Sequence, residues 1–201
     1  MRLLGSGASP FVRKCRIVVV ECDLTAAVTD TDVAAGPGLA EDALKAANPL
    51  AKIPALIRDD GPTLFDSRVI CRYLDARADR GLYPETRLWE ILTLEALADG
   101  MCDAAVLMVY EGRFRAPEQQ NHSWVEAQWD RVSRSLDVLE SRWGAHLAGP
   151  LDMGQIALIS ALGYLDFRHG ERNWRDKRPS LAEWCAKQAE RPSVRDTMPT
   201  P

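Results

Sequence analysis

The pattern of apolar and polar positions changes character near residue 80. Before this point, short apolar runs bounded by turn residues alternate with amphipathic stretches; after it, apolar residues recur at helical spacing over long stretches. Short bounded runs predict β-strands, and recurrence every three or four residues predicts helices. We therefore expect an α/β part followed by an all-α part, with residues 79–84 (DRGLYP) as a punctuated linker between them.

The α/β part is predicted to follow the order strand, helix, strand and then strand, strand, helix, with a short extra helix between the two halves. The strands are expected at residues 2–4, 28–33, 53–58 and 63–65, and the helices at residues 11–21, 41–47 and 67–78. The last two strands are joined by Asp59-Asp60-Gly61-Pro62, a strong turn sequence. This order resembles a thioredoxin-like βαβ-ββα domain, which we assign to residues 1–78.

The second part is predicted to be a helical bundle that occupies residues 85–201. Its helices are expected at residues 86–110 and 117–144, in the apolar stretch that follows Asp152, and at residues 180–189. Asp152 precedes Gln155 by three residues, which is the spacing of an N-terminal capping box.

Composition and charge narrow the class of protein. Apolar residues make up 46% of the chain and charged residues 27%, which are ordinary globular values. The net charge of −4 gives no electrostatic case for nucleic acid, and no apolar stretch reaches membrane-spanning length. The five cysteines include no Cys-x-x-Cys pair, so we expect reduced thiols in a cytoplasmic protein. The three histidines lie far apart, and no metal site is predicted.

The first motif with chemical content is the Ile53-Pro54 step, which opens an apolar run. Pro54 has no N–H for a sheet ladder, so it belongs at the start of a strand. An X-Pro bond at this point is a candidate for the cis form, which would turn the backbone of Ile53 outward. The exposed N–H and C=O of Ile53 would then be able to pair with an extended peptide.

The second motif is Asp66-Ser67, at the start of the helix predicted for residues 67–78. Asp and Ser are helix-capping residues, and the first turn of a helix has unpaired N–H groups and a partial positive charge. Such a turn suits a ligand carboxylate. The carboxylate of Asp66 would suit an amino group on the same ligand.

The third motif is Ser9-Pro10-Phe11-Val12, where the first strand gives way to the first helix. Thioredoxin-like folds carry the redox motif Cys-Pro-x-Cys here, and both cysteines are absent from this chain, which excludes dithiol exchange through the motif. Ser9 fits two roles, a plain helix cap and a hydrogen-bond donor to a bound thiolate. In the second role the helix N-terminus would also lower the pKa of the thiol.

Together the three motifs resemble the glutathione site of the glutathione S-transferase family. The resemblance implies that Ile53, before a cis Pro54, pairs with the cysteinyl backbone of glutathione. It also implies that Asp66 and Ser67 hold the γ-glutamyl group, and it favours Ser9 as the group that activates the glutathione thiol.

The resemblance extends into the helical part, where residues 95–100 (EALADG) look like the bacterial branch of the family. It implies a homodimer, in which Asp99 or Asp103 of the neighbouring subunit receives the γ-glutamyl amino group. It also implies an apolar pocket for an electrophile, with Phe11, Met108 and Tyr110 as candidate wall residues.

Two charged patterns are more simply explained as solvated helix faces. They are the basic cluster Arg13, Lys14 and Arg16 and the carboxylates Glu95, Asp99 and Asp103. The cysteines are expected to pack in the core, including Cys15 on the first helix.

We therefore expect a cytoplasmic, homodimeric glutathione transferase with the GST fold. It would use glutathione as co-substrate and no metal, and it would conjugate the glutathione sulfur to a small hydrophobic electrophile, a detoxification reaction. The alternative is a non-catalytic glutathione-binding or protein-interaction module on the same fold. A glutathione-dependent reductase is disfavoured because Ser9 replaces the required cysteine.

Overall fold

The computed structural model describes residues 1–200. The chain forms two compact units, and each is described by itself. The N-terminal unit contains residues 1–88 together with the tail that begins at Pro192, and the helical unit contains residues 89–191.

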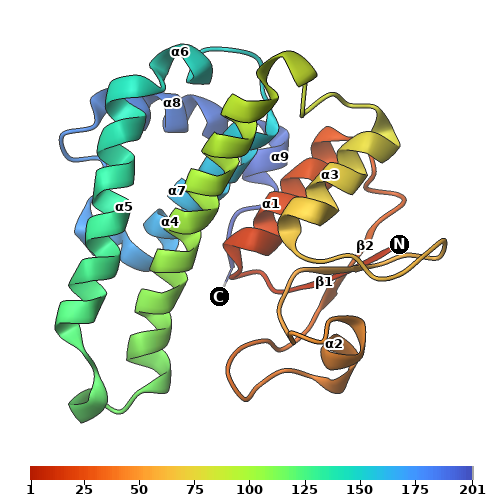
Figure 1. Ribbon diagram of the computed structural model, residues 1–201, viewed down its shortest axis with the longest axis horizontal. Coiled ribbons are helices and arrows are strands. Elements are labelled where there is room, and N and C mark those ends of the chain that lie inside the picture. The colour runs from red at the N-terminus through yellow and green to blue at the C-terminus, as the bar shows by residue number, and fades with distance from the viewer. Residues whose placement is uncertain (201) are drawn as a thin grey trace. The chain divides into compact units, whose positions relative to one another are not determined.

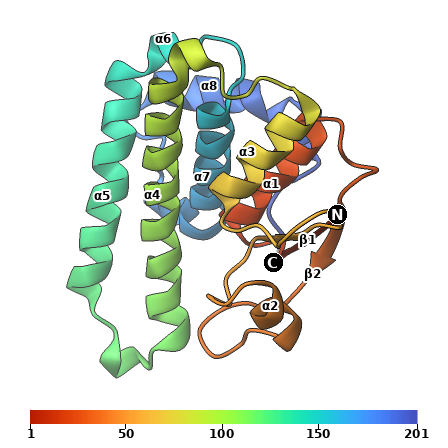
Figure 2. The same cartoon turned by 45° about the vertical axis from the view of Figure 1, so that its right-hand side comes forward.

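The N-terminal unit is built on a three-stranded mixed sheet with the order β2-β1-β3. The central strand β1 (Arg2–Gly5) pairs in parallel with β2 (Thr29–Asp32) and antiparallel with β3 (Ala55–Ile57). Helices α1 (Pro10–Glu21) and α3 (Ser67–Ala78) lie side by side on one face of the sheet, and α2 (Asp42–Ala47) lies on the other (Figure 1, Figure 2). The predicted α/β order is confirmed up to the last predicted strand.

Buried residues explain the layers of this unit. Leu3 and Leu4, adjacent on β1, are each 1% exposed because successive side chains of a strand point to opposite faces and both faces are covered by helices. Leu4 packs with Val33, Leu44 and Ala55 in a small core on the α2 side.

The strand predicted at residues 63–65 is wrong as a strand. The structure has one antiparallel bridge there, in which the backbones of Leu56 and Leu64 exchange two hydrogen bonds of 2.9 Å. The ladder has little room to extend, because Pro62 has no N–H to donate and Asp66 already caps α3.

The helical unit is all-α, as predicted. Its helices are α4 (Leu88–Phe114), α5 (His122–Arg142), α6 (Gly144–Leu147), α7 (Met153–His169) and α8 (Pro179–Ala189), with 3-10 turns at Pro117–Gln119 and Gly170–Arg172. A further 3-10 turn, Glu85–Arg87, precedes α4 and belongs to the N-terminal unit. Helix α7 is buried along most of its length. It packs closely on α4, because a Cβ added to Gly154 would lie 2.9 Å from Leu94 Cβ. The Asp152 side chain accepts a hydrogen bond from the Gln155 N–H at 3.1 Å, which confirms the Asp152 half of the predicted capping box. The Gln155 side-chain amide donates instead to the carbonyls of His146 at 3.2 Å and Pro150 at 3.0 Å.

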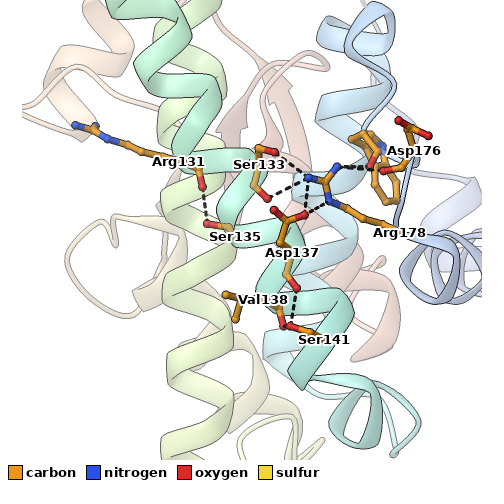
Figure 3. A network of polar contacts seen from close by, with 9 residues as sticks. Arg131, Ser133, Ser135, Asp137, Val138, Ser141, Asp176 and Arg178 are labelled. Carbon is orange, nitrogen blue, oxygen red and sulfur yellow. Dashed lines mark hydrogen bonds and ion pairs between the residues drawn. The ribbon is translucent and has the colours of Figure 1, made fainter.

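A polar network ties α5 to the segment before α8 (Figure 3). The guanidinium of Arg178 donates to Asp137 Oδ1 at 2.9 Å, to Ser133 Oγ at 2.8 Å and to the Trp174 carbonyl at 2.9 Å. Arg178 is only 8% exposed, so its planar guanidinium donates to these three acceptors in a region that is largely shielded from solvent.

Helix α9 (Pro192–Arg195) and the residues after it pack with the N-terminal unit, against α1. The helical domain predicted from the sequence, residues 85–201, included this segment. Its side chains are mostly polar and carry no periodic apolar pattern, so only the contacts that it makes reveal where it packs.

Candidate functional site

Ser9 is the N-cap of α1. Its Oγ accepts a hydrogen bond from the Val12 N–H at 3.3 Å, and Pro10 occupies the first turn. The side chain is half-exposed. A hydroxyl that accepts one hydrogen bond keeps its own proton to donate. The capping role and the thiolate-contact role that Ser9 fits are therefore compatible in one side chain.

The peptide bond between Ile53 and Pro54 is cis, as the sequence analysis anticipated. Pro54 is buried, Ile53 is half-exposed, and β3 begins at the next residue. The loop before them is held by Asn48, whose amide donates to the Lys52 carbonyl at 2.8 Å and accepts from the Leu50 N–H at 3.0 Å.

Asp66 is the N-cap of α3, and its carboxylate accepts a hydrogen bond from the Arg68 N–H at 3.0 Å. Asp66 is exposed, whereas Ser67 is only 2% exposed. The peptide bond between Phe65 and Asp66 is also cis. The first turn of α3 therefore presents an exposed carboxylate beside backbone N–H groups that the helix itself leaves unused.

The topology brings the three motifs to the same edge of the sheet. Leu4 lies opposite Ala55 in an antiparallel pair, so the end of β1 that leads to Ser9 lies beside the start of β3, where Pro54 is. The bridge between Leu56 and Leu64 is antiparallel too, so the chain that leaves Leu64 for Asp66 runs back toward this edge. Side chains and backbone from three separate parts of the sequence thus converge.

The predicted solvated carboxylate face on α4 is wrong for two of its three residues. Glu95 and Asp99 are 2% and 3% exposed, whereas Asp103 is exposed. A step of four residues turns an α-helix about 40° beyond a full circle, so the three positions span about 80° of the surface. The first two therefore fall on the packed side of the helix and the third on the open side.

The predicted solvated basic face on α1 is also wrong for two residues. Arg13 and Lys14 are 2% and 1% exposed. Arg16 is partly exposed and is paired with Asp30 at 2.6 Å and Asp32 at 3.6 Å. The cluster thus offers no open cationic patch for an anionic ligand.

The thiols of the N-terminal unit are packed, as predicted. Cys15 and Cys71 are both 0% exposed, and their sulfurs lie 3.8 Å apart between α1 and α3. Burial, with a further contribution from the Asp75 carboxylate, raises the pKa of the Cys22 thiol to about 11. Burial blocks access to these thiols, and the raised pKa of Cys22 also disfavours its reactive thiolate form.

Two features relevant to the site were missed from the sequence. Asn48 was interpreted only as a turn residue, although an Asn in a turn is known to form hydrogen bonds between its side chain and the nearby backbone. The tail contacts on α1 have no sequence signal of their own.

Of the candidate wall residues, Phe11 and Tyr110 are half-exposed and Met108 is 6% exposed.

Two further features are absent from the part of the chain that the structure describes. No helix within residues 1–200 combines the length and apolar character needed to cross a membrane. Over the same residues, no group of three or more His, Cys, Asp or Glu side chains is arranged to hold a metal ion.

Comparisons with known proteins identify the family of the chain. Residues 8–77 match the family model for the glutathione S-transferase N-terminal domain, and residues 123–187 match that for the C-terminal domain. The chain is 33% identical over 205 residues to YibF, an uncharacterized GST-like protein of Escherichia coli strain K12, with 99% of this chain and 98% of that protein covered.

Solved structures extend the likeness to three dimensions. A glutathione transferase family member from Pseudomonas fluorescens Pf-5 with bound glutathione is 42% identical, with a TM-score of 0.96 over 100% of this chain and 99% of that one. Another crystal structure from the same organism, with bound S-(propanoic acid)-glutathione, is 41% identical, with a TM-score of 0.91 over 100% of both chains. By sequence and by fold, this chain belongs to the glutathione S-transferase family.

Proposed function

We propose that the protein binds glutathione at the sheet edge that carries Ser9, Ile53 and Asp66, and that it conjugates the glutathione sulfur to a small hydrophobic electrophile. The observation that carries this proposal is the convergence of a hydroxyl, an exposed strand-start backbone and an acidic helix cap at one edge. Each group matches one part of the tripeptide: the thiol, the cysteinyl backbone and the γ-glutamyl head.

In this proposal Ser9 activates the thiol without becoming the nucleophile. Its hydroxyl proton donates to the glutathione sulfur, while its oxygen continues to accept from the Val12 N–H. The N-terminus of α1 adds a partial positive charge, which favours thiolate over thiol. The thiol proton leaves to solvent. The thiolate electron pair then forms the new carbon–sulfur bond, and the leaving group of the electrophile departs to solvent as an anion with the electron pair of the bond that breaks.

The head group is held by the first turn of α3. Asp66 is exposed and carries a negative charge for the γ-glutamyl amino group, and the backbone N–H groups of the turn that the helix itself leaves unused suit the α-carboxylate. Ser67 is buried, so we assign its contribution to the backbone N–H and not to the hydroxyl.

Two bound states among the relatives support the two halves of the proposal. One crystal structure of the family member from Pseudomonas fluorescens Pf-5 holds glutathione, and a second structure of the same target holds S-(propanoic acid)-glutathione, in which the sulfur carries a substituent. A site of the same fold therefore accommodates both the nucleophile and a thioether of it. A cytoplasmic, detoxifying role is part of the same proposal.

We further propose that the protein is a homodimer. The 27-residue helix α4 is apolar on most faces, and it leaves Trp89 76% exposed and Leu107 41% exposed, which supports a partner on this helix. Asp103 is exposed and Asp99 is buried, so Asp103 is the better candidate for a contact with the neighbouring subunit's glutathione. Sedimentation that shows a monomer at assay concentration would contradict both the homodimer and the contact of Asp103 with the neighbouring subunit's glutathione.

The decisive experiment is a titration of bound glutathione, followed by thiolate absorbance against pH with protein in excess. We expect the bound thiol to have a pKa below that of free glutathione and Ser9→Ala to return it toward the free value. Ser6→Ala removes a hydroxyl from the same loop and serves as the matched control. Binding without a lowered thiol pKa would instead support the non-catalytic module, and absence of binding would reject the proposal.

A further inference from the structure

The tail of the chain runs along α1 as a strap, which we define as residues 192–200. It begins near the C-terminal end of α1, where the Ser193 hydroxyl donates to Glu21. Midway, the Arg13 guanidinium donates to the Val194 carbonyl at 3.2 Å and to Met198 Sδ at 3.4 Å. All of these contacts lie within the N-terminal unit.

The strap ends at the loop that carries Ser9. The Thr200 N–H donates to the Gly7 carbonyl at 3.2 Å. This loop is a tight turn, closed by a hydrogen bond of 3.3 Å from the Ser9 N–H to the Ser6 carbonyl. The tip of the strap therefore holds the turn whose last residue is the proposed thiol-activating serine.

The absence of a side chain at Gly7 makes room for the strap. A Cβ added at this position would overlap Thr200 Oγ1, and Gly7 does not have the positive φ that would by itself demand glycine. Close approach of the strap is thus the constraint that the structure shows at this position.

The anchor of the strap is buried and directly linked to the same serine. Arg13 is 2% exposed, Ser193 is 2% exposed and Val194 is 3% exposed, so the strap is a packed element and not a loose end. The Arg13 backbone N–H also donates to the Ser9 carbonyl at 3.0 Å, the first hydrogen bond of the helix. One residue thereby joins the strap to the residue that caps α1.

We propose that the strap is a positioning element for Ser9. By fixing the Gly7 carbonyl, the Thr200 N–H restricts the turn from Ser6 to Ser9 and keeps the Ser9 hydroxyl aimed outward from the N-terminus of α1. This inference rests on the proposed function for its catalytic meaning, whereas the hold of the strap on the turn is a property of the free protein.

The test compares full-length variants that differ in one hydrogen-bond donor. Thr200→Pro removes the N–H, and Thr200→Ala removes the side chain but keeps the N–H. In the protein without glutathione, we expect the Ser9 amide to exchange with solvent about threefold to tenfold faster in Thr200→Pro, the range expected for one hydrogen bond, and at the wild-type rate in Thr200→Ala.

A second pair of variants tests the same contact by steric means. Gly7→Ala should crowd Thr200 even after its hydroxyl turns away, because the added Cβ would lie 3.3 Å from Thr200 Cβ and 3.4 Å from the Thr200 carbonyl oxygen. We expect this crowding to speed exchange at Ser9, and the double variant Gly7→Ala/Thr200→Gly to return the rate toward the wild-type value by removing the threonine side chain. Unchanged exchange in both Thr200→Pro and Gly7→Ala would overturn the inference, whatever glutathione does.

The functional readout is the pKa of the bound glutathione thiol in the same variants. We expect it to rise toward the free value in Thr200→Pro and to stay depressed in Thr200→Ala. Faster exchange with an unchanged bound-thiol pKa would show that the strap does not position Ser9. If wild-type protein itself shows no depression, the proposed function fails, and the exchange rates still decide whether the strap holds the turn.

Discussion

At the scale of single residues, Asn48 shows how a buried side chain prepares a binding backbone. It is 2% exposed and spans the loop from Leu50 to Lys52 with both ends of its amide. The residue that follows this loop is Ile53, whose exposed backbone is the proposed partner of the glutathione cysteine. The loop must therefore be held in one conformation for Ile53 to pair with the glutathione backbone.

We predict that Asn48→Ala lowers the free energy of unfolding by about 1 to 3 kcal/mol, because two backbone groups lose their partners. Glutathione affinity should fall as well, since Ile53 loses its support. Urea unfolding and a glutathione titration measure the two effects, and Gln119→Ala, which removes an exposed amide, is the control. A stability loss without weaker binding would show that the loop is not part of the site.

At the scale of helices and strands, local signals predicted most of the structure. The helix from Ser67 to Ala78 was expected with those bounds, because its cap and its apolar spacing agree. The strand at residues 63–65 was not distinguishable from a single bridge, since both show the same short apolar run. Burial of Glu95, Asp99, Arg13 and Lys14 was not predictable, because charge alone indicates a solvated face and only tertiary packing decides otherwise.

Two helix caps with the same geometry allow a test of how burial changes the value of a cap. Asp152 and Asn121 each accept a hydrogen bond from the N–H three residues ahead, at 3.1 Å and 3.0 Å, but Asp152 is 0% exposed and Asn121 is exposed. We predict that Asp152→Ala costs about 2 kcal/mol or more and that Asn121→Ala costs about 1 kcal/mol or less, since the buried N–H of Gln155 lacks water as a substitute and Asp152 Oδ2 also contacts His146 Nε2 at 2.9 Å. Equal costs in urea unfolding would contradict this.

The Arg178 network tests what a fork-shaped donor contributes between helices. Arg178→Lys keeps the charge but replaces the planar fork, so the acceptors on Asp137, Ser133 and Trp174 cannot all be satisfied. We predict a loss of about 1.5 to 3 kcal/mol. Arg134→Lys, which alters an exposed pair with Asp130 at 3.5 Å, should cost less than about 0.5 kcal/mol. Thermal unfolding of both variants provides the comparison.

At the scale of the whole molecule, the site motifs could be found in the sequence, but their arrangement could not. Ser9, Ile53 and Asp66 each sit beside a turn or cap signal, and the antiparallel pairing of β1 with β3 brings them to one edge. The strap is different: residues 192–200 contact Gly7 and Arg13 across nearly the whole length of the chain. No local pattern encodes a contact at that separation.

The pH dependence of stability should report the buried histidine of the helical unit. Burial is the main cause that lowers the pKa of His169 below its usual 6.5, and the charges of Arg172 and Arg168 lower it further. The hydrogen bond from His169 Nε2–H to the Ala105 carbonyl at 3.0 Å and the charge of Glu171 act in the opposite direction. The unfolded chain therefore binds a proton at His169 more readily than the folded protein. By linkage, the contribution of His169 to stability is fully present well above pH 6.5 and is lost as the pH falls through 6.5 and below it.

We predict that the free energy of unfolding decreases between pH about 7.5 and about 5.5, a window above the range in which carboxylates titrate. His169→Gln should flatten this dependence, because glutamine cannot take up the proton in the unfolded state. His122→Gln removes an exposed histidine from the same unit and should keep the wild-type slope. Urea unfolding across the window measures all three proteins. A wild-type slope that survives in His169→Gln would mean that another group carries the acid sensitivity, and that burial of His169 does not set it.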